Sequence, residues 1–175
     1  MNIIVLDTET TGLNPSYEKI LELSIVDSEG KVLFDSRIKP GNRRKWPEAE
    51  AVHGISYNDL KDLKTIRHHK KEIVKILSEA DLIVGYNINF DMNMLLSNLN
   101  LTEKEHQIIS NKERFDVMTA FAEVFGQWNE KYGCYKWQKL ITAADYYNYQ
   151  WTGSAHGALA DTLATLYVYN CLNNN

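Results

Sequence analysis

Residues Ile3 to Leu13 read IIVLDTETTGL and place two acids side by side at the end of an apolar run. The composition of that run is typical of a β-strand. Side chains of a strand alternate between its two faces, so Asp7 and Glu9 point the same way. Two carboxylates held this close repel each other, and a hard divalent cation such as Mg²⁺ or Mn²⁺ relieves the repulsion. The alternative is a strand end whose acids simply face water.

The length and composition fit one folded domain, which we expect to span residues 1–175. Of these 175 residues, 44% are hydrophobic, enough for an ordinary core. No apolar run approaches the roughly 20 residues of a membrane-spanning helix, and no basic segment precedes the first apolar run, so neither a membrane association nor a signal peptide is expected. Cys134 and Cys171 form no metal-binding pattern, which favours free thiols in a reducing cytoplasm.

The net charge of −4 limits the kind of nucleic-acid binding that the chain can perform. It argues against a protein that coats nucleic acid through bulk electrostatics. It still allows an enzyme that grips a short stretch through metals and a local patch. A site rich in carboxylates itself makes the total charge more negative.

Three strands in succession open the chain. Ile20–Val26 is a second apolar strand, and Lys31–Ile38 alternates as a third. The connection between them, Ser28-Glu29-Gly30, is short, which favours antiparallel neighbours. The sequence therefore predicts a β-meander whose first strand carries the paired acids.

Helices and short strands follow the meander. Apolar spacing predicts helices over His69–Ala80 and Phe90–Leu96, on either side of the wholly apolar strand Leu82–Val84. Two short helices are also expected, one beginning at Pro47 and one over Tyr57–Leu60 with Ser56 as its N-cap. The change from strands to alternating helix and strand predicts an α/β fold.

The C-terminal third is expected to be mainly helical. Arg114–Met118 is a fifth short strand or the lead into a helix over residues 117–125, with Asp116 preferred as its N-cap. Gly126–Tyr135 is expected to be a loop, and Trp137–Tyr147 and Gly157–Leu172 have helical spacing. The fold prediction is a five-stranded mixed sheet flanked by helices.

Three side chains outside the first strand are candidates for the same site. Asp91 lies in the first turn of a helix after a buried strand, where clefts of α/β sheets form. Its alternative role is to stabilise the helix N-terminus. His156 and Asp161 can face one site if His156 precedes the last helix, and Gly157 permits that sharp entry. Their alternative is a surface histidine and a solvated acid.

Together these residues resemble the three motifs of the DEDDh exonucleases. The motifs read Asp7-x-Glu9-Thr10-Thr11-Gly12-Leu13, Asn87-x-x-Phe90-Asp91 and His156-x-x-x-x-Asp161. The pattern is most similar to the proofreading-subunit-like branch within the ribonuclease H-like fold. His53-Gly54-Ile55-Ser56 resembles a segment that this branch carries between its first and second motifs. The similarity covers nearly the whole chain in the same order.

The resemblance implies a role for each motif residue. Asp7 would bridge two divalent cations, Mg²⁺ or Mn²⁺. Glu9 and Asp161 would complete the ion that binds the attacking water, and Asp91 would serve the second ion directly or through water. Two cations about 3.5–4 Å apart would activate that water and relieve charge on the leaving oxygen. His156 would be the general base.

The resemblance also implies contacts to the terminal nucleotide. The backbone from Thr8 to Gly12 would lie against it, and Leu13 would be a wedge between bases. For His53 and Ile55, local loop packing is an equal alternative. The expected substrate contacts are Thr8, Thr10, Gly12, Leu13, His53, Ile55, Asn87 and Phe90.

Two further stretches have less specific signals. Arg43, Arg44 and Trp46 could hold a nucleic-acid strand by charge and stacking, although such stretches are more often solvated loops. The aromatic residues near the C-terminus flank helical segments and are expected to lie mostly in the core. They are Trp128, Tyr132, Tyr135, Trp137, Tyr146, Tyr147, Tyr149 and Trp151.

These observations predict a metal-dependent 3′→5′ exonuclease that releases nucleoside 5′-monophosphates from single-stranded or frayed DNA 3′ ends. One alternative is a 3′→5′ exoribonuclease acting on short RNA or RNA 3′ ends. The other is a catalytically silent nucleic-acid-binding adaptor of the same fold. A preference for DNA depends on contacts near the sugar that the motifs do not fix, and the sequence leaves a polymerase partner open.

Overall fold

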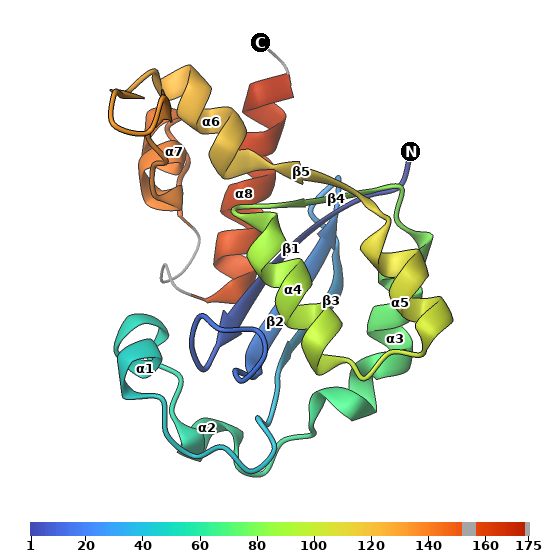
Figure 1. The fold of residues 1–175 in the computed structure, drawn as a ribbon. Helices are drawn as coiled ribbons and strands as arrows, with labels where there is room; N and C mark the ends of the chain where they lie inside the picture. The colour runs from blue at the N-terminus through green and yellow to red at the C-terminus, as the bar shows by residue number, and fades with distance from the viewer. Residues whose placement is uncertain (152–156, 174–175) are drawn as a thin grey trace.

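The computed structural model describes residues 1–151 and 157–173. A mixed five-stranded sheet in the order β3-β2-β1-β4-β5 lies at its centre (Figure 1). The strands are β1 (Ile3–Thr10), β2 (Ile20–Asp27), β3 (Val32–Arg37), β4 (Leu82–Gly85) and β5 (Glu113–Asp116). The first three pair antiparallel, whereas β4 is parallel to both β1 and β5. The predicted meander and the mixed five-stranded sheet are confirmed.

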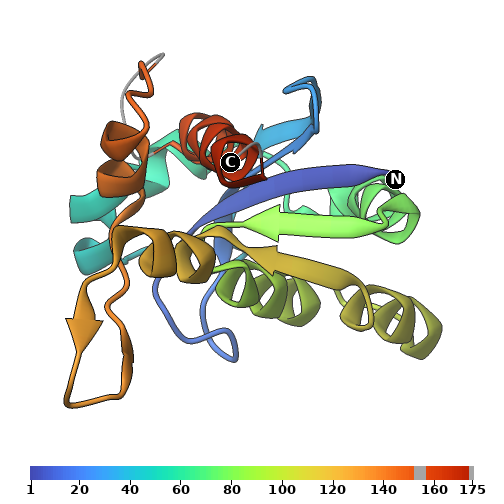
Figure 2. The same ribbon diagram turned by 90° about the horizontal axis from the view of Figure 1, so that it is seen from above.

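Helices cover both faces of this sheet (Figure 2). They are α1 (Pro47–His53), α2 (Tyr57–Leu60), α3 (Ile66–Glu79), α4 (Ile88–Asn98), α5 (Glu103–Ser110), α6 (Val117–Phe125), α7 (Leu140–Tyr146) and α8 (Ala158–Asn173). The alternation of β1 sends Ile4 and Leu6 into a core with α3, α4 and α5. It sends Val5 into a second core with α6, α7 and α8. Among the described helices, none combines the length and apolar character needed to span a membrane.

A smaller core lies beneath α1 and α2. Leu21, Trp46, Ile55 and Leu60 form it, and the Trp46 indole Nε1–H donates to the Ile55 carbonyl oxygen at 2.8 Å. Trp46 is only 2% exposed, so the hypothesis that this ring stacks on a nucleic-acid base is wrong. The basic residues around it suggested a solvated loop, but the indole is the main apolar anchor of this segment.

The beginnings of three helices differ from the sequence prediction by two residues or more, and one of them is α4, which begins at Ile88 and not at Phe90. α3 begins at Ile66, three residues before the predicted His69, because Ile66 already packs against the core. α7 begins at Leu140 and not at Trp137, because Lys139 has an extended backbone. The predicted cap of α6 is confirmed, since the Asp116 carboxylate accepts the backbone N–H groups of Met118 and Thr119.

Helix α5 was not foreseen, although its sequence carries a start signal. The Thr102 hydroxyl accepts the backbone N–H of Glu105 at 3.3 Å, and the Glu105 carboxylate accepts the N–H of Thr102 at 2.7 Å. This reciprocal pair is a capping box, which the spacing of threonine and glutamate three residues apart indicates. The short apolar face of this helix gives a weaker signal than the cap.

The aromatic segment after α6 forms a hairpin, where a loop was predicted. Its strands are β6 (Trp128–Asn129) and β7 (Cys134–Tyr135), and the hairpin projects away from the main sheet (Figure 2). The expectation that the aromatic cluster lies mostly in the core is wrong for five of its eight members. The exposed ones are Trp128, Tyr132, Tyr135, Trp137 and Tyr146. Trp128 and Tyr135 pack edge to face across the hairpin, with ring centroids 5.2 Å apart.

Candidate active site

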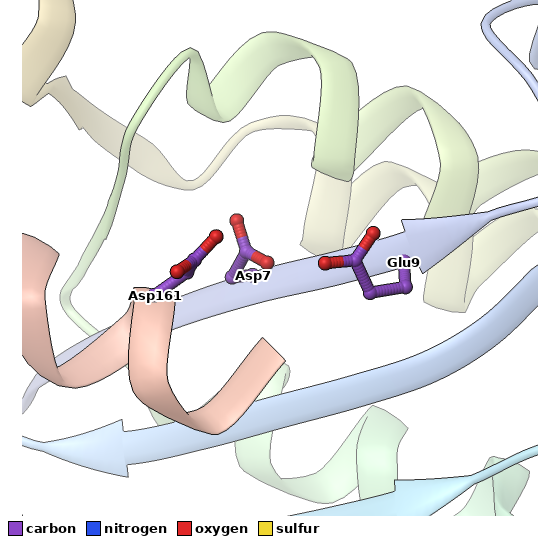
Figure 3. Close-up of side chains that lie close together, drawn as sticks. All are labelled: Asp7, Glu9 and Asp161. Carbon is purple, nitrogen blue, oxygen red and sulfur yellow. The ribbon is translucent and has the colours of Figure 1, made fainter. Parts of the chain in front are cut away.

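Three carboxylates meet near the carboxyl end of β1. Asp7 and Glu9 come from the strand, and Asp161 comes from the first turn of α8. Each contributes an oxygen, and these oxygens lie within 4.8 Å of one another. Figure 3 shows the three side chains gathered along β1 beside the start of α8. Carboxylate oxygens are the ligands that Mg²⁺ and Mn²⁺ prefer, so this donor set fits a hard divalent cation.

The strand geometry explains why these acids share one space. Asp7 and Glu9 lie on the same side of β1 as Val5, which is the side that α8 covers. The parallel pairing of β1 with β4 ends at the pair Val5–Val84, so the acids lie beyond it. Gly85 then allows a tight turn into α4, because a Cβ there would lie 2.7 Å from Cδ1 of Ile88.

Asp91 joins the site from the opposite side of β1. It lies in the first turn of α4 and is 2% exposed. Its Oδ1 accepts the backbone N–H of Thr8 at 3.0 Å and the Thr8 hydroxyl at 2.6 Å. Asp91 is not one of the three acids whose oxygens lie within 4.8 Å of one another, but its charge acts on Asp7. The fold therefore assembles all four motif acids around one strand end.

Burial and mutual repulsion disfavour ionisation of these acids. Burial raises the pKa of Asp7 well above its usual range, and the charges of Asp91, Glu9 and Asp161 raise it further. Burial, with the charges of Asp161, Glu22 and Asp91, raises the pKa of Glu9 to about 8. Burial also raises the pKa of Asp91 to about 7, although its bonds from Thr8 act in the opposite direction. A cation in this position would relieve the repulsion.

Glu22 is a fifth acid at this site that the sequence did not reveal. The antiparallel register places it opposite Glu9 on β2. Its side chain is 15% exposed and pairs with Arg37, with 3.7 Å between Oε1 and Nε. Burial raises the pKa of Glu22, while Arg37 and the backbone N–H of Ala158, at the start of α8, act in the opposite direction. Glu22 thus lies between β2 and the helix that carries Asp161.

The segment after Glu9 is held by its own side chains. The Thr10 hydroxyl donates to the carbonyl oxygen of Gly12 at 2.8 Å, and the Thr11 hydroxyl donates to the Glu18 carboxylate. Gly12 fits this packing because a Cβ there would lie 3.0 Å from Cδ of Glu18. Leu13, at the tip of the loop, is 84% exposed. The predicted wedge is therefore on the surface, whereas the side chains of Thr8 and Thr10 are buried.

The His53–Ile55 segment contacts the end of β1 through the side chain of His53. His53 Nδ1 accepts the backbone N–H of Ile55 at 3.0 Å, so Nε2 carries the hydrogen that points to the Thr10 carbonyl oxygen at 3.2 Å. Burial lowers the pKa of His53, which favours this neutral form. Ile55 is 1% exposed and packs in the core under α1 and α2. Ile55 thus fits the alternative of local loop packing, and His53 is bonded to the end of β1.

The remaining motif residues surround the start of α4. Asn87 has a left-handed backbone conformation, and its N–H donates to the Asp116 carboxylate at 3.1 Å. Phe90 is half-buried against the core beneath α4. His156, the predicted general base, lies outside the described residues.

Comparisons with known proteins agree with this geometry. A family model described as an exonuclease matches residues 4–169. An uncharacterised exonuclease, CP81, of Escherichia phage 186 is 30% identical over 172 residues, which cover 97% of this chain and 87% of that protein. DNA polymerase III subunit epsilon of Buchnera aphidicola subsp. Schizaphis graminum is 32% identical over 118 residues, covering 62% of this chain and 50% of that subunit.

Solved structures of Exonuclease I share the fold. One has a TM-score of 0.80 at 18% identity and covers 99% of this chain and 41% of its own. The zinc-bound complex of Escherichia coli Exonuclease I with single-stranded DNA has a TM-score of 0.74 at 17% identity, with coverage of 99% and 40%. The chain thus spans about half of the polymerase subunit and less than half of Exonuclease I. The ribonuclease H-like fold is confirmed, and with a family model matched over residues 4–169 this chain belongs to the DEDD exonuclease family.

Proposed function

We propose that this protein removes nucleoside 5′-monophosphates one at a time from the 3′ end of single-stranded or frayed DNA. The observation that carries the proposal is the cluster of Asp7, Glu9 and Asp161, whose oxygens lie within 4.8 Å of one another beside buried Asp91. The relative named DNA polymerase III subunit epsilon and the Exonuclease I complex with single-stranded DNA support DNA as the substrate.

The four acids would hold two divalent cations, Mg²⁺ or Mn²⁺. Asp7 belongs to the cluster with Glu9 and Asp161 and is also acted on by the charge of Asp91, which suits a residue shared by both ions. When bound, such a pair supplies a nucleophile at neutral pH and neutralises charge on the leaving oxygen. The raised pKa values of Asp7, Glu9 and Asp91 support this role, since these carboxylates gain most from a cation.

Other residues of the chain would hold this geometry. The two bonds from Thr8 orient Asp91 and favour its ionised form. Glu22 would position the start of α8 next to β2, and His53 would fix the end of β1 through its hydrogen bond to the Thr10 carbonyl oxygen. His156 lies five residues before Asp161 in the sequence. It would accept the proton of the attacking water, because the ordinary pKa of a histidine side chain lies near neutral pH and the neutral imidazole is a base.

The loop after β1 would receive the terminal nucleotide. The exposed side chain of Leu13 would pack between the last two bases, and the backbone of Thr8 to Gly12 would line the sugar. A binding site of this kind accommodates one unpaired 3′-terminal nucleotide, so digestion should require a free 3′-hydroxyl. The whole described chain would act as one exonuclease domain, because both cores share the central sheet.

The test is the digestion of matched DNA and RNA oligomers of about 20 nucleotides, labelled at either end, with Mg²⁺ or with EDTA. A label on the 3′-terminal nucleotide should be released at once as a mononucleotide, and a 5′ label should give a ladder that shortens from the 3′ end. Asp7→Asn serves as the inactive control. Internal cuts in a circular single strand would contradict the exonuclease proposal.

The same assay decides between the alternatives. Faster digestion of RNA than of DNA would identify an exoribonuclease. Binding of both oligomers without any release of nucleotide in Mg²⁺ or Mn²⁺ would identify a silent adaptor.

A further inference from the structure

A groove lined by basic residues lies beside the β1–β2 loop. Its volume is about 800 Å³, and its walls are that loop, the segment after β3, the start of α3 and the end of α4. Four cations line it, namely Lys19, Lys39, Arg43 and Arg67, and none of the described residues that line it is acidic. We call this feature the basic groove. In a chain with a net charge of −4, such a local excess of positive charge points to an anionic ligand.

Two of these cations are available for a ligand. Lys19 and Arg67 are exposed and form no ion pair with any residue in the described part of the chain. Lys39 and Arg43 are held in place: the Lys39 Nζ donates to the Lys61 carbonyl oxygen at 2.5 Å, and the Arg43 guanidinium pairs with Glu18 at 2.9 Å. The groove therefore combines two cationic side chains that are held in place with two that can adjust to a ligand.

The basic groove lies at the same end of the sheet as the carboxylates but on the face that α3 and α4 cover, since Ile20 and Ile38 of its lining belong to that core. The Thr11 N–H donates to the Lys19 carbonyl oxygen at 2.9 Å, and Thr11 lies about 7 Å along the chain from Glu9. At the other wall, Asn98 is the last residue of α4 and lies about 10 Å along the helix from Asp91. Figure 1 shows the β1–β2 loop and the ends of these helices gathered at one end of the sheet.

The lining suits a nucleic-acid strand. Tyr17, which is 71% exposed, offers a ring for base stacking, and the amides of Asn42, Asn98 and Asn100 offer hydrogen bonds. Aromatic rings next to cations are the usual means of holding single strands without sequence preference. An isolated phosphate would use only part of a groove of this size.

We propose that the basic groove binds the phosphodiester backbone of the substrate strand, on the 5′ side of the nucleotide that is being removed. This inference rests on the proposed function, which places the 3′ end at Asp7 and Glu9. Lys19 and Arg67 contact phosphates, while Lys39 and Arg43 form the floor. The groove determines how tightly a long strand is held, and the carboxylates determine whether it is cut.

The test compares the double variant Lys19→Ala/Arg67→Ala with the charge-matched control Lys31→Ala/Lys104→Ala. Both control lysines are exposed, and neither lines the groove. At low salt the groove variant should raise the KM for single-stranded DNA of about 20 nucleotides about 10-fold, with kcat kept. The KM for a trinucleotide should not change, and the control should behave as the wild type.

Three results would overturn the proposal. The first is an unchanged KM for the long strand in the groove variant. The second is an equal rise of the KM for the trinucleotide, and the third is an equal rise of the KM for the long strand in the control variant. Thymidine monophosphate is a further control. If it inhibits the wild type more strongly than the groove variant, while both proteins keep the same ratio of KM between the long strand and the trinucleotide, the groove holds free nucleotide and not the strand.

A binding measurement separates this inference from the proposed function. If the wild-type protein cuts neither substrate, the proposed function fails. The Kd for a labelled oligothymidylate of about 20 residues, measured by fluorescence anisotropy, then tests binding in the groove independently of cleavage. Loss of two phosphate contacts should reduce the slope of log Kd against log salt by about 1.4. An unchanged slope would contradict the groove.

Discussion

Replacing Glu9 with glutamine should stabilise the metal-free protein at alkaline pH. Burial and the charges of Asp161, Glu22 and Asp91 raise the pKa of Glu9 to about 8 from its ordinary value of 4.5. The unfolded chain loses this proton near pH 4.5, whereas the folded chain keeps it up to about pH 8. Between these values the folded state binds more protons, so the free energy of unfolding falls as pH rises.

The size of the effect follows from that pKa. Because each pKa unit corresponds to about 1.4 kcal/mol, full ionisation of Glu9 would cost the metal-free fold about 5 kcal/mol. Screening by solvent at a carboxylate of intermediate exposure reduces this figure, and we expect about 2–5 kcal/mol. The substitution removes the ionisable proton while keeping the shape of the side chain. It should therefore matter most above pH 8 and least near pH 5.

The assay is urea unfolding in EDTA, followed by tryptophan fluorescence at about pH 5 and about pH 8.5. The wild type should lose stability between these pH values, and Glu9→Gln should lose less. Glu29→Gln, on the exposed β2–β3 turn, is the matched control and should follow the wild type. The reasoning is refuted if Glu9→Gln is no more stable than the wild type at high pH, or if the wild type gains stability as pH rises.

Three further predictions concern turnover. Asp7→Asn should abolish hydrolysis while its circular dichroism spectrum stays that of the wild type, since it removes a shared ligand and relieves repulsion. Thr8→Val should lower kcat about 10- to 100-fold by removing the 2.6 Å hydroxyl bond to Asp91, and Thr8→Ser should restore it. His156→Ala should lower kcat about 10²–10⁴-fold and remove the rise of the rate through the histidine pKa, with Mn²⁺ binding kept; a preserved rise would end the general-base role.

The sequence predicted the parts of the site that depend on local geometry. Alternation along β1 places Asp7 and Glu9 on one face whatever the rest of the fold does. Glu22 escaped notice because its position opposite Glu9 depends on the register between two strands, which no local pattern reveals. For His53 and Ile55 the motif could not separate a contact to substrate from packing; Ile55 is buried and packs in the core, whereas His53 is half-buried and its contact to substrate stays a prediction.

The surface was harder to predict than the core. Trp46 lies in a basic stretch that resembles a solvated loop, yet its indole is buried in one core cluster with Leu21, Ile55 and Leu60. The aromatic residues near Trp128 have the composition of a core but lie on a projecting hairpin, where Trp128 and Tyr135 pack edge to face and both are exposed. Composition predicts that aromatic side chains will be buried, but which of them are buried, and against which residues, depends on the tertiary structure.

Equilibrium binding of Mn²⁺ tests the central claim most directly. Electron paramagnetic resonance counts free and bound Mn²⁺ without any need for turnover, here with thymidine monophosphate present to stand for the 3′-terminal nucleotide. The wild type should bind two ions per chain. Asp7→Asn should lose both or bind them far more weakly, while Asp62→Asn, on an exposed segment after α2, should bind as the wild type. Failure of the wild type to bind Mn²⁺ at millimolar concentration, or undiminished binding by Asp7→Asn, would contradict a two-ion site built on β1.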